Sequence, residues 1–227
     1  MYESWLYFLQ RPEVVGQWVL EHLWLIFVSN GVAVCIAVPL GIYISAEGRQ
    51  RLADAVLYVA SILMTIPSLA LFGLLMPALA GMGLKSIGFL PAVIALILYG
   101  QLPILRNTYT AIRAVDPAMV EAGRGMGMSS AQILFRVKLP LAMPVIMAGL
   151  RNAVVLNIGI TTIAAVIGAG GLGTPIFRGL RTGRMDLIIV GAVAVSLLAL
   201  TADALLAAVE KGLTPRGIHV ERTGSQA

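Results

Sequence analysis

The sequence predicts an all-α, polytopic membrane protein with about five transmembrane helices, and two observations support this fold class. Of the 227 residues, 59% are hydrophobic and only 12% are charged, whereas about 25% of the residues of a soluble domain are charged. Uncharged runs cover residues 22–46, 55–84, 86–105 and 152–177, and several exceed the roughly 20 residues that a helix needs to cross a bilayer. We therefore expect one transmembrane domain over residues 1–227, without a soluble part large enough to fold alone.

Breaks in hydrophobicity divide this domain into five spans and their connections. A mixed, aromatic segment at 1–18 is expected to be a short interfacial helix that is broken at Pro12. A charged turn follows the first span, a glycine turn follows the second, and a glycine-rich connector at Gly168–Asp186 follows the fourth. A polar tail is expected at 211–227. The predicted spans are about Leu20–Ser45, Asp54–Pro77, Phe89–Ile112, Leu141–Ile167 and Leu187–Val209.

The 116–140 loop is the longest segment in the middle of the chain that is too polar to be a membrane span. Asp116–Pro117 predicts a capped helix start, because aspartate is a good N-cap and proline fits the first helical position. Ser129 opens a second helix, with Gln132 completing a capping box, and we expect Leu139–Pro140 to end it. The glycines available for the turn between the two helices are Gly123, Gly125 and Gly127.

The spacing of residues in this loop resembles the "EAA" loop of ATP-binding-cassette importer permeases. In that family the loop is cytoplasmic and couples transport to ATP hydrolysis by docking into a groove on a separate ATPase subunit. Gly123 stands where the family usually has alanine, and Val137 where it often has isoleucine. The resemblance implies that the ATPase-coupling residues are Glu121, Ala122, Gly123, Gly127, Leu139 and Pro140.

The 116–140 loop has two other interpretations. A helix–turn–helix can be a DNA reader, and the segment Arg106–Lys138 carries five basic residues against two acidic ones. However, a helix tethered to the bilayer at both ends could hardly reach into a DNA groove, so we expect no nucleic-acid partner. The second alternative is a plain membrane-surface connector whose positive charge only sets the topology.

Further segments resemble one branch of these importers, the permeases for glycine betaine, carnitine and choline, and the similarity covers about Leu20–Glu210. It implies the type I permease fold, two ATPase subunits, a second permease that is a copy or a paralogue, and an extracytoplasmic binding protein. The segments that carry it, besides the 116–140 loop, are Thr65–Leu71, Tyr99 with Leu102–Thr108, and Gly168–Gly173. Aromatic cages recognise quaternary ammonium ions, but only 7% of residues are aromatic, so we expect the binding protein to choose the substrate.

Alternatives of other classes remain open at this point. A permease of the same build could carry methionine or another amino acid. Another alternative is an ATP-independent channel or secondary transporter, and the absence of an internal repeat argues against the inverted-repeat secondary transporters. Gly168–Gly173 fits G-x-G-x-x-G, but a membrane span precedes it and Pro175 follows, which is not the βαβ context of a dinucleotide site. We interpret it as a flexible re-entrant turn or a loop beside a gate.

No pattern indicates an enzyme. His22 and His219 lie far apart in the sequence, each is expected to be an interfacial or tail residue, and no Cys/His/Asp group has metal-ligand spacing. The sequence contains no G-x-x-x-x-G-K-[ST]. We expect this chain to bind no cofactor and no metal, and a partner subunit to use ATP with Mg²⁺.

Prolines inside the predicted spans indicate helices that line a cavity or move, because proline removes a helical hydrogen bond at a cost of about 3 kcal/mol. The alternative is that these prolines only shape packing. The best pathway candidates are Thr65, Pro67 and Ser68, where hydroxyl groups can bond the carbonyls that proline frees. Asn107 is the fourth residue that we predict along the translocation pathway.

Two charges are predicted at membrane depth, Arg151 in the fourth span and Asp203 in the fifth. An intramembrane charge is a functional hypothesis by default, and we expect the two to pair. Neutralising either should then reduce the folded yield more than exchanging them; the alternative is that Arg151 extends towards the head groups. With the 116–140 loop placed inside, the inner segments hold ten basic residues and the outer segments five, which predicts the N-terminus out and the C-terminus in. The resemblance to importer permeases implies the bacterial cytoplasmic (inner) membrane.

Overall fold

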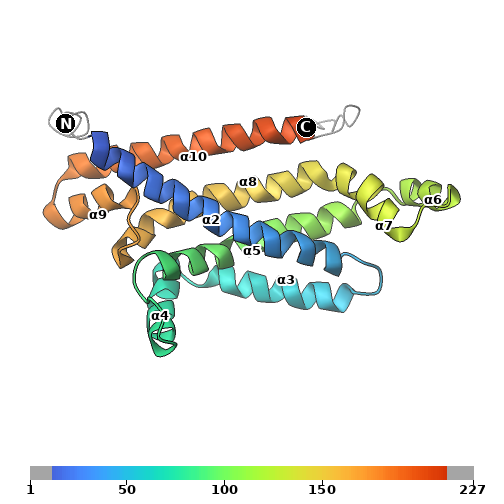
Figure 1. Cartoon of the computed structure of the whole chain (residues 1–227), viewed down its shortest axis with the longest axis horizontal. Helices are drawn as coiled ribbons and strands as arrows, with labels where there is room; N and C mark the ends of the chain where they lie inside the picture. Colours follow the sequence, from blue (N-terminus) through green and yellow to red (C-terminus); the bar gives the residue numbers. More distant parts are fainter. Residues whose placement is uncertain (1–11, 214–227) are drawn as a thin grey trace, which may run out of the picture.

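The computed structural model describes residues 12–213 as an elongated helical bundle, with no β-strand in that part of the chain (Figure 1). Four helical stretches are long and apolar enough to cross a membrane, and there are five spanning units when a sharply bent helix pair is counted as one broken span. This agrees with the predicted number of spans. The helices are α2 (Pro12–Ile44), α3 (Gln50–Thr65), α4 (Ser68–Gly81), α5 (Phe89–Arg113), α6 (Pro117–Gly125), α7 (Ser130–Ile133), α8 (Leu139–Ala164), α9 (Gly173–Thr182) and α10 (Met185–Leu213).

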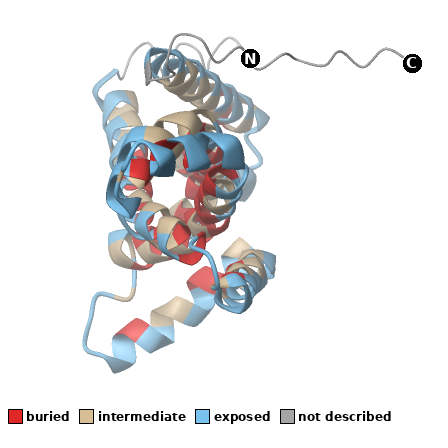
Figure 2. Cartoon of the chain, turned by 90° about the vertical axis from the view of Figure 1, so that its right-hand side faces the viewer, coloured by how far each residue is buried: buried red, intermediate tan, exposed pale blue. Residues whose placement is uncertain are grey.

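Helices α2, α5 and α8 form the core of the bundle, and Figure 2 shows that buried residues gather on the inner sides of the helices. Glycines bring the helix backbones together where a larger side chain would collide. A Cβ at Gly41 would lie 2.8 Å from the side chain of Thr108, and one at Gly149 would lie 2.8 Å from the Pro103 carbonyl oxygen. Small residues at crossings are typical of helix packing in membranes.

The second spanning unit is broken, which corrects the expectation of one span over Asp54–Pro77. α3 ends at Thr65, α4 begins at Ser68, and their axes differ by 99°. Pro67 explains the break, because proline lacks an N–H and disfavours helical geometry in the residue before it. Accordingly, Ile66 is extended, with φ −66° and ψ 125°. In Figure 1, α4 points away from the bundle axis.

The 116–140 loop contains the two predicted helices. The Asp116 side chain accepts a hydrogen bond from the Ala118 N–H at 2.8 Å and caps α6. Ser129 and Gln132 form the predicted capping box at the start of α7. Gly127 has φ +78° and makes the left-handed turn between the two helices.

The prediction that Leu139–Pro140 ends the second helix of this loop is wrong. α7 continues through a π-helical segment, Leu134–Lys138, directly into α8. The wider π turn changes the hydrogen-bond register just before the proline. Pro140 therefore lies in the first turn of α8, where its missing N–H costs little.

The remaining differences concern the ends and the glycine-rich connector. Pro12 begins α2, so residues 12–18 belong to the first spanning helix; residues 1–11 of the predicted interfacial segment, and with them the predicted break at Pro12, lie outside the described residues. α10 extends to Leu213, beyond the predicted start of the polar tail, and residues 214–227 are likewise not described. The connector Gly168–Asp186 contains a separate helix, α9.

Candidate translocation and coupling sites

The predicted coupling residues lie at one end of the bundle. Glu121 and Ala122 are exposed on α6. Gly123 is buried against Ile133 of α7, and a Cβ there would meet the Ile133 side chain at 3.4 Å, an ordinary contact. The structure places the other three residues beside these helices rather than on the same exposed face: Gly127 in the turn, and Leu139 and Pro140 half-buried at the start of α8.

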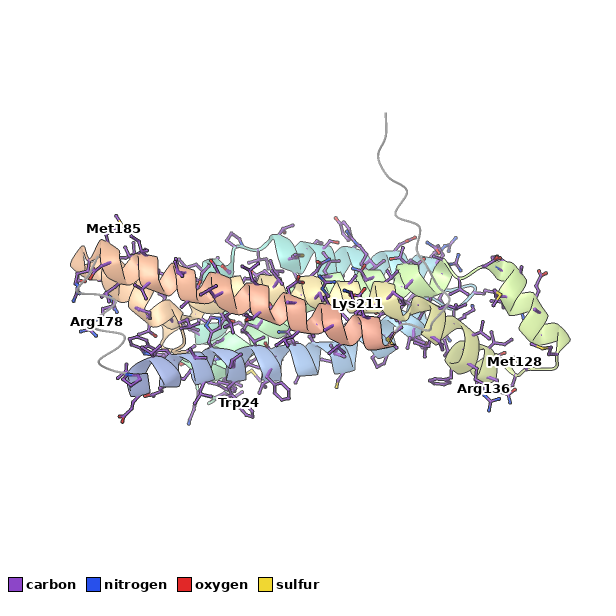
Figure 3. The ribbon with its side chains drawn as sticks, turned by 90° about the horizontal axis from the view of Figure 1, so that it is seen from above. Trp24, Met128, Arg136, Arg178, Met185 and Lys211 are labelled. Carbon is purple, nitrogen blue, oxygen red and sulfur yellow. The ribbon has the colours of Figure 1, made fainter. Side chains whose placement is uncertain are left out.

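A hollow separates the 116–140 loop from the ends of the spanning helices. Two adjoining cavities of about 330 and 300 Å³ lie there, and both are lined by Ser45, Glu47, Ile112, Val120, Arg124 and Lys138. An ion pair across the hollow joins Arg124 to Glu47 at 3.8 Å, and both side chains are mostly exposed. In Figure 3 the labelled Met128 and Arg136 lie beyond the labelled Lys211 of α10. The loop therefore projects from the bundle and is only lightly attached to it.

The predicted pathway residues are not all in one place. Thr65, Pro67 and Ser68 surround the α3–α4 break, and the first two are exposed. Asn107 lies eight residues beyond Tyr99 on α5, about 12 Å along the helix, where it packs against Gly149 of α8. The structure thus groups three of the four residues and separates Asn107 from them.

The hydrogen bonds at the α3–α4 break differ from those expected. The Thr65 hydroxyl donates to the Ile62 carbonyl within its own helix at 2.7 Å. The Ile66 carbonyl, which faces the break, accepts instead from the Tyr99 hydroxyl of α5. Sequence reasoning placed Tyr99 only in a family segment, because its partner lies 33 residues away.

A buried pair of asparagines joins the three core helices, and the sequence analysis missed it. Asn157 of α8 donates to the Asn30 side chain of α2 at 3.1 Å and to the Leu96 carbonyl of α5 at 3.1 Å. Asn157 is fully buried, and within residues 12–213 its Oδ1 has no hydrogen-bond partner. Two uncharged polar residues in otherwise apolar spans were the available sequence signal, since polar side chains hold membrane helices together.

The glycine-rich turn at Gly168–Gly173 is clamped to the start of α2. Glu21 accepts a hydrogen bond from the Gly171 N–H at 2.9 Å, and His22 Nδ1 accepts from the Leu172 N–H at 3.3 Å. His22 Nε2 donates to the Ile158 carbonyl of α8 at 3.2 Å, which fixes the tautomer. His22 is fully buried, which corrects its assignment as an interfacial residue.

The glycines of this turn are required by its geometry. Gly168, Gly170 and Gly171 have φ near +80°, a backbone conformation that favours glycine. A Cβ at Gly170 would also collide with the Glu21 carboxylate. α8 and its short 3₁₀ extension precede the turn, so the strand that a dinucleotide site needs is not there.

Arg151 of α8 and Asp203 of α10 are brought together, with two parallel hydrogen bonds of 2.9 and 3.0 Å. The sequence analysis did not predict a second acidic partner of Arg151: Glu210 of α10 accepts from the same guanidinium at 2.9 Å. Asp203 and Glu210 are seven residues apart, two helical turns, so they share a face of α10. That spacing was the signal in the sequence that could have identified Glu210.

These features define a class of protein, a polytopic membrane component with a broken spanning unit and a projecting loop of two helices. Residues 37–215 match the family described as "Binding-protein-dependent transport system inner membrane component", and the chain belongs to this family. It is therefore an inner-membrane transport subunit.

Several transport permeases are similar to this protein over most of the chain. It is 46% identical to the osmoprotectant import permease protein OsmW of Salmonella typhimurium, over 94% of this chain and 98% of the relative. It is 43% identical to the carnitine transport permease protein OpuCD of Listeria monocytogenes, over 88% of each chain. The identity to the choline transport system permease protein OpuBB of Bacillus subtilis is 42%, again over 88% of each chain.

Solved structures share the fold. The MetNI methionine ABC transporter in an inward-facing conformation has a chain that superposes with a TM-score of 0.79 at 23% identity, covering 91% of this chain and 99% of that chain. A chain of an amino acid ABC transporter solved with histidines gives a TM-score of 0.75 at 22% identity, covering 91% and 97%. The bundle is thus the fold of ATP-binding-cassette importer permeases.

Proposed function

We propose that this chain is the permease subunit of an ATP-binding-cassette importer for a quaternary ammonium osmoprotectant such as glycine betaine, choline or carnitine. The observation that carries the proposal is the 46% identity, over nearly the whole chain, to a permease named for osmoprotectant import. Relatives named for carnitine and choline support the same substrate class. Five spanning units supply half of a pathway, so a second permease, identical or paralogous, completes it.

The energy for import comes from a separate ATPase subunit that binds ATP with Mg²⁺. The exposed residues of α6, with Glu121 and Ala122 at their centre, form the docking surface for that subunit. The lightly attached 116–140 loop supports this role, because a docking element has to move relative to the bundle. A separate extracytoplasmic binding protein delivers the substrate to the opposite end.

The 116–140 loop faces the cytoplasm, which places the N-terminus outside and the C-terminus inside. Ten basic residues then lie on the inner side and five on the outer side, in line with the positive-inside rule. α9, with the exposed Arg178, lies at the end of the bundle opposite the loop (Figure 3). Lipid covers the outer face of α2, where Trp24 and Phe27 are 58% and 73% exposed.

An amino-acid substrate is the second candidate function. It is favoured by one observation, the superposition on the methionine transporter chain. Because that identity is 23%, the superposition supports the fold and leaves the cargo to the closer relatives.

The test is purification of the tagged chain from its native membranes, followed by ATPase assays of the recovered complex. We expect an ATPase subunit and a binding protein to copurify, and glycine betaine, choline or carnitine to stimulate hydrolysis. Stimulation by methionine alone would select the second candidate. Solute flux in liposomes that contain this chain alone and no ATP would contradict the importer assignment.

Charge reversal on α6 tests the docking surface. Glu121→Lys should leave membrane insertion intact but abolish ATPase association, because an exposed acidic residue becomes basic at the proposed contact. Glu13→Lys, an equal reversal at an exposed position at the opposite end, is the matched control and should retain the ATPase. Normal association and transport in Glu121→Lys would refute the coupling role.

A further inference from the structure

The elbow between α3 and α4 places the Ile66 carbonyl between the two helices. Ile66 and Pro67 are extended, with ψ of 125° and 134°. The first helical bond of α4 runs from the Leu71 N–H to the Pro67 carbonyl at 2.9 Å, so the Ile66 carbonyl has no helical donor. In a membrane, an unpaired backbone group costs several kcal/mol in gross terms. The Tyr99 hydroxyl fills this position.

The other attachments of α4 to the bundle are apolar contacts. Of its 14 residues, the buried ones are Leu71, Phe72 and Leu79, and the first two pack with Tyr99 and Leu96 of α5. Leu69 and Leu74 are 56% and 61% exposed. Leu75 and Met76 are half-buried against the same cluster, so apolar contacts hold the first part of α4, while the helix points away from the bundle axis (Figure 1).

The part of α5 that carries Tyr99 is fixed to the core. One turn before it, the Leu96 carbonyl accepts a hydrogen bond from Asn157 of α8. One residue after it, a Cβ at Gly100 would lie 3.3 Å from Ala33 of α2 and from the Asn157 side chain. Tyr99 itself is 4% exposed. This fixed part of the three-helix core thus bonds the backbone of the elbow through the Tyr99 hydroxyl, beside the apolar contacts of α4.

We propose that Tyr99 is a positioning residue for transport: its hydrogen bond to the Ile66 carbonyl holds α4 in the bent position, and its release lets α4 change its angle to α3. The transport role rests on the function proposed above. The bend exposes Thr65 and Pro67, so the angle of α4 sets which surface of the broken span faces the pathway.

Removal of a single oxygen atom tests this role. Tyr99→Phe keeps the ring in its packed position and leaves the Ile66 carbonyl unpaired. Tyr109→Phe is a matched control, because Tyr109 is on the same helix and its hydroxyl donates to Gln50 of α3 at 2.9 Å, away from the elbow. Both variants lose one hydroxyl that bonds the broken span.

The angle is measured as a distance between spin labels on either side of the elbow. The sites are Tyr58→Cys on α3 and Leu74→Cys on α4, both exposed, in a Cys35→Ser background that removes the native cysteine. Labelled chains are diluted among unlabelled copies in lipid nanodiscs, so that distances within one chain dominate. The measurement needs no substrate.

We expect a narrow distance distribution in the parent and in Tyr109→Phe. In Tyr99→Phe the population with an altered distance should rise about 5- to 30-fold, the change that loss of one buried hydrogen bond produces. Identical distributions in the two variants would overturn the proposal. If Tyr99→Phe is not recovered, Pro67→Ala, which restores an N–H at the bend, should shift the distribution in the same way; an unshifted distribution counts against the proposal.

A transport assay then separates this inference from the proposed function. In complexes with the ATPase and the binding protein, Tyr99→Phe should lower the osmolyte imported per ATP hydrolysed at least 3-fold, with an unchanged KM for uptake. A shifted distance with unchanged import per ATP would show that Tyr99 has no role in transport. If the parent imports no quaternary ammonium compound, the proposed function fails, while the distances still decide whether Tyr99 holds the elbow.

Discussion

At the scale of single residues, Arg151 is the main polar attachment of the outermost helix. α10 contacts only α8 and α9 among its substantial helix neighbours in the described chain, and most of its apolar surface is exposed. The guanidinium of Arg151 bonds both Asp203 and Glu210. One cation therefore balances two carboxylates on the same face of α10.

This arrangement changes the expected result of exchanging charges. Arg151→Gln should lower the folded yield most, because both carboxylates lose the guanidinium that bonds them. Asp203→Asn and Glu210→Gln should each cost less, since the arginine keeps one partner. The double variant Arg151→Asp with Asp203→Arg should not restore the yield, because an aspartate at 151 would face Glu210.

The measurement is the monodisperse fraction after detergent extraction, monitored by fluorescence size-exclusion chromatography. Thr201→Ala, on the exposed face of the same stretch of α10, serves as the control for substitution in this helix. Full recovery in the charge-exchanged variant would mean that Glu210 is dispensable and that the pair alone holds α10.

At the scale of helices, close packing of α5 on α8 depends on one glycine. A Cβ at Gly149 would lie 2.8 Å from the Pro103 carbonyl and still closer to the Asn107 side chain. Gly159 is on the same helix, but no atom lies within 4 Å of the position that its Cβ would take. The two glycines thus form a natural matched pair.

We expect opposite effects of alanine at these two positions. Gly149→Ala should destabilise the bundle by about 1–3 kcal/mol, because the two backbones must separate. Gly159→Ala should be neutral or stabilising by up to about 1 kcal/mol, because it only improves helix propensity. Thermal unfolding in detergent, followed by tryptophan fluorescence, measures both. Equal midpoints would show that α5 and α8 can move apart at no cost.

Local chemistry explains which elements the sequence could predict. Spans need about 20 apolar residues, and the caps at Asp116 and Ser129 depend only on neighbours within a few residues. Both signals were therefore readable, and the structure agrees with them. The prediction that the helix ends at Leu139–Pro140 was wrong, because the π-helical segment before Pro140 lets the helix continue into α8.

Contacts between distant residues could not be predicted in this way. Asn157 meets Asn30 across 127 residues, and Arg151 meets Glu210 across 59. The pairing of Arg151 with Asp203 was guessed only because charges are rare at membrane depth. Hydroxyl and amide side chains are commoner in the spans than charged ones, and each has many possible partners. Only the packing of the helices decides which partner it meets.

At the scale of the whole molecule, one continuous helical path runs from the 116–140 loop to the opposite end. It comprises Ser130–Ile167, 38 residues, or about 57 Å at 1.5 Å per residue. At its far end His22 bonds the Ile158 carbonyl and the turn that follows α8. This path includes Pro144, so the transmission of a displacement from α7 to the far end depends on the stiffness of the backbone along it.

The stiffness of this helical path can be tested at the π-helical segment. Phe135 and Arg136 are exposed in the π-helical segment, so replacing them removes little packing. Phe135→Gly with Arg136→Gly should soften the junction, because each glycine disfavours the helix by about 1 kcal/mol relative to alanine. The double alanine variant removes the same side chains and keeps the helix stiff.

If α8 transmits the movement, the glycine variant should still copurify with the ATPase and still hydrolyse ATP, yet import several-fold less substrate per ATP than the alanine variant. The difference between the two isolates backbone stiffness, since both lack the aromatic ring and the guanidinium. Equal import per ATP would mean that the junction need not be rigid. The loop would then have to act through its other attachment to the bundle, the ion pair of Arg124 with Glu47. α8 would not transmit the movement.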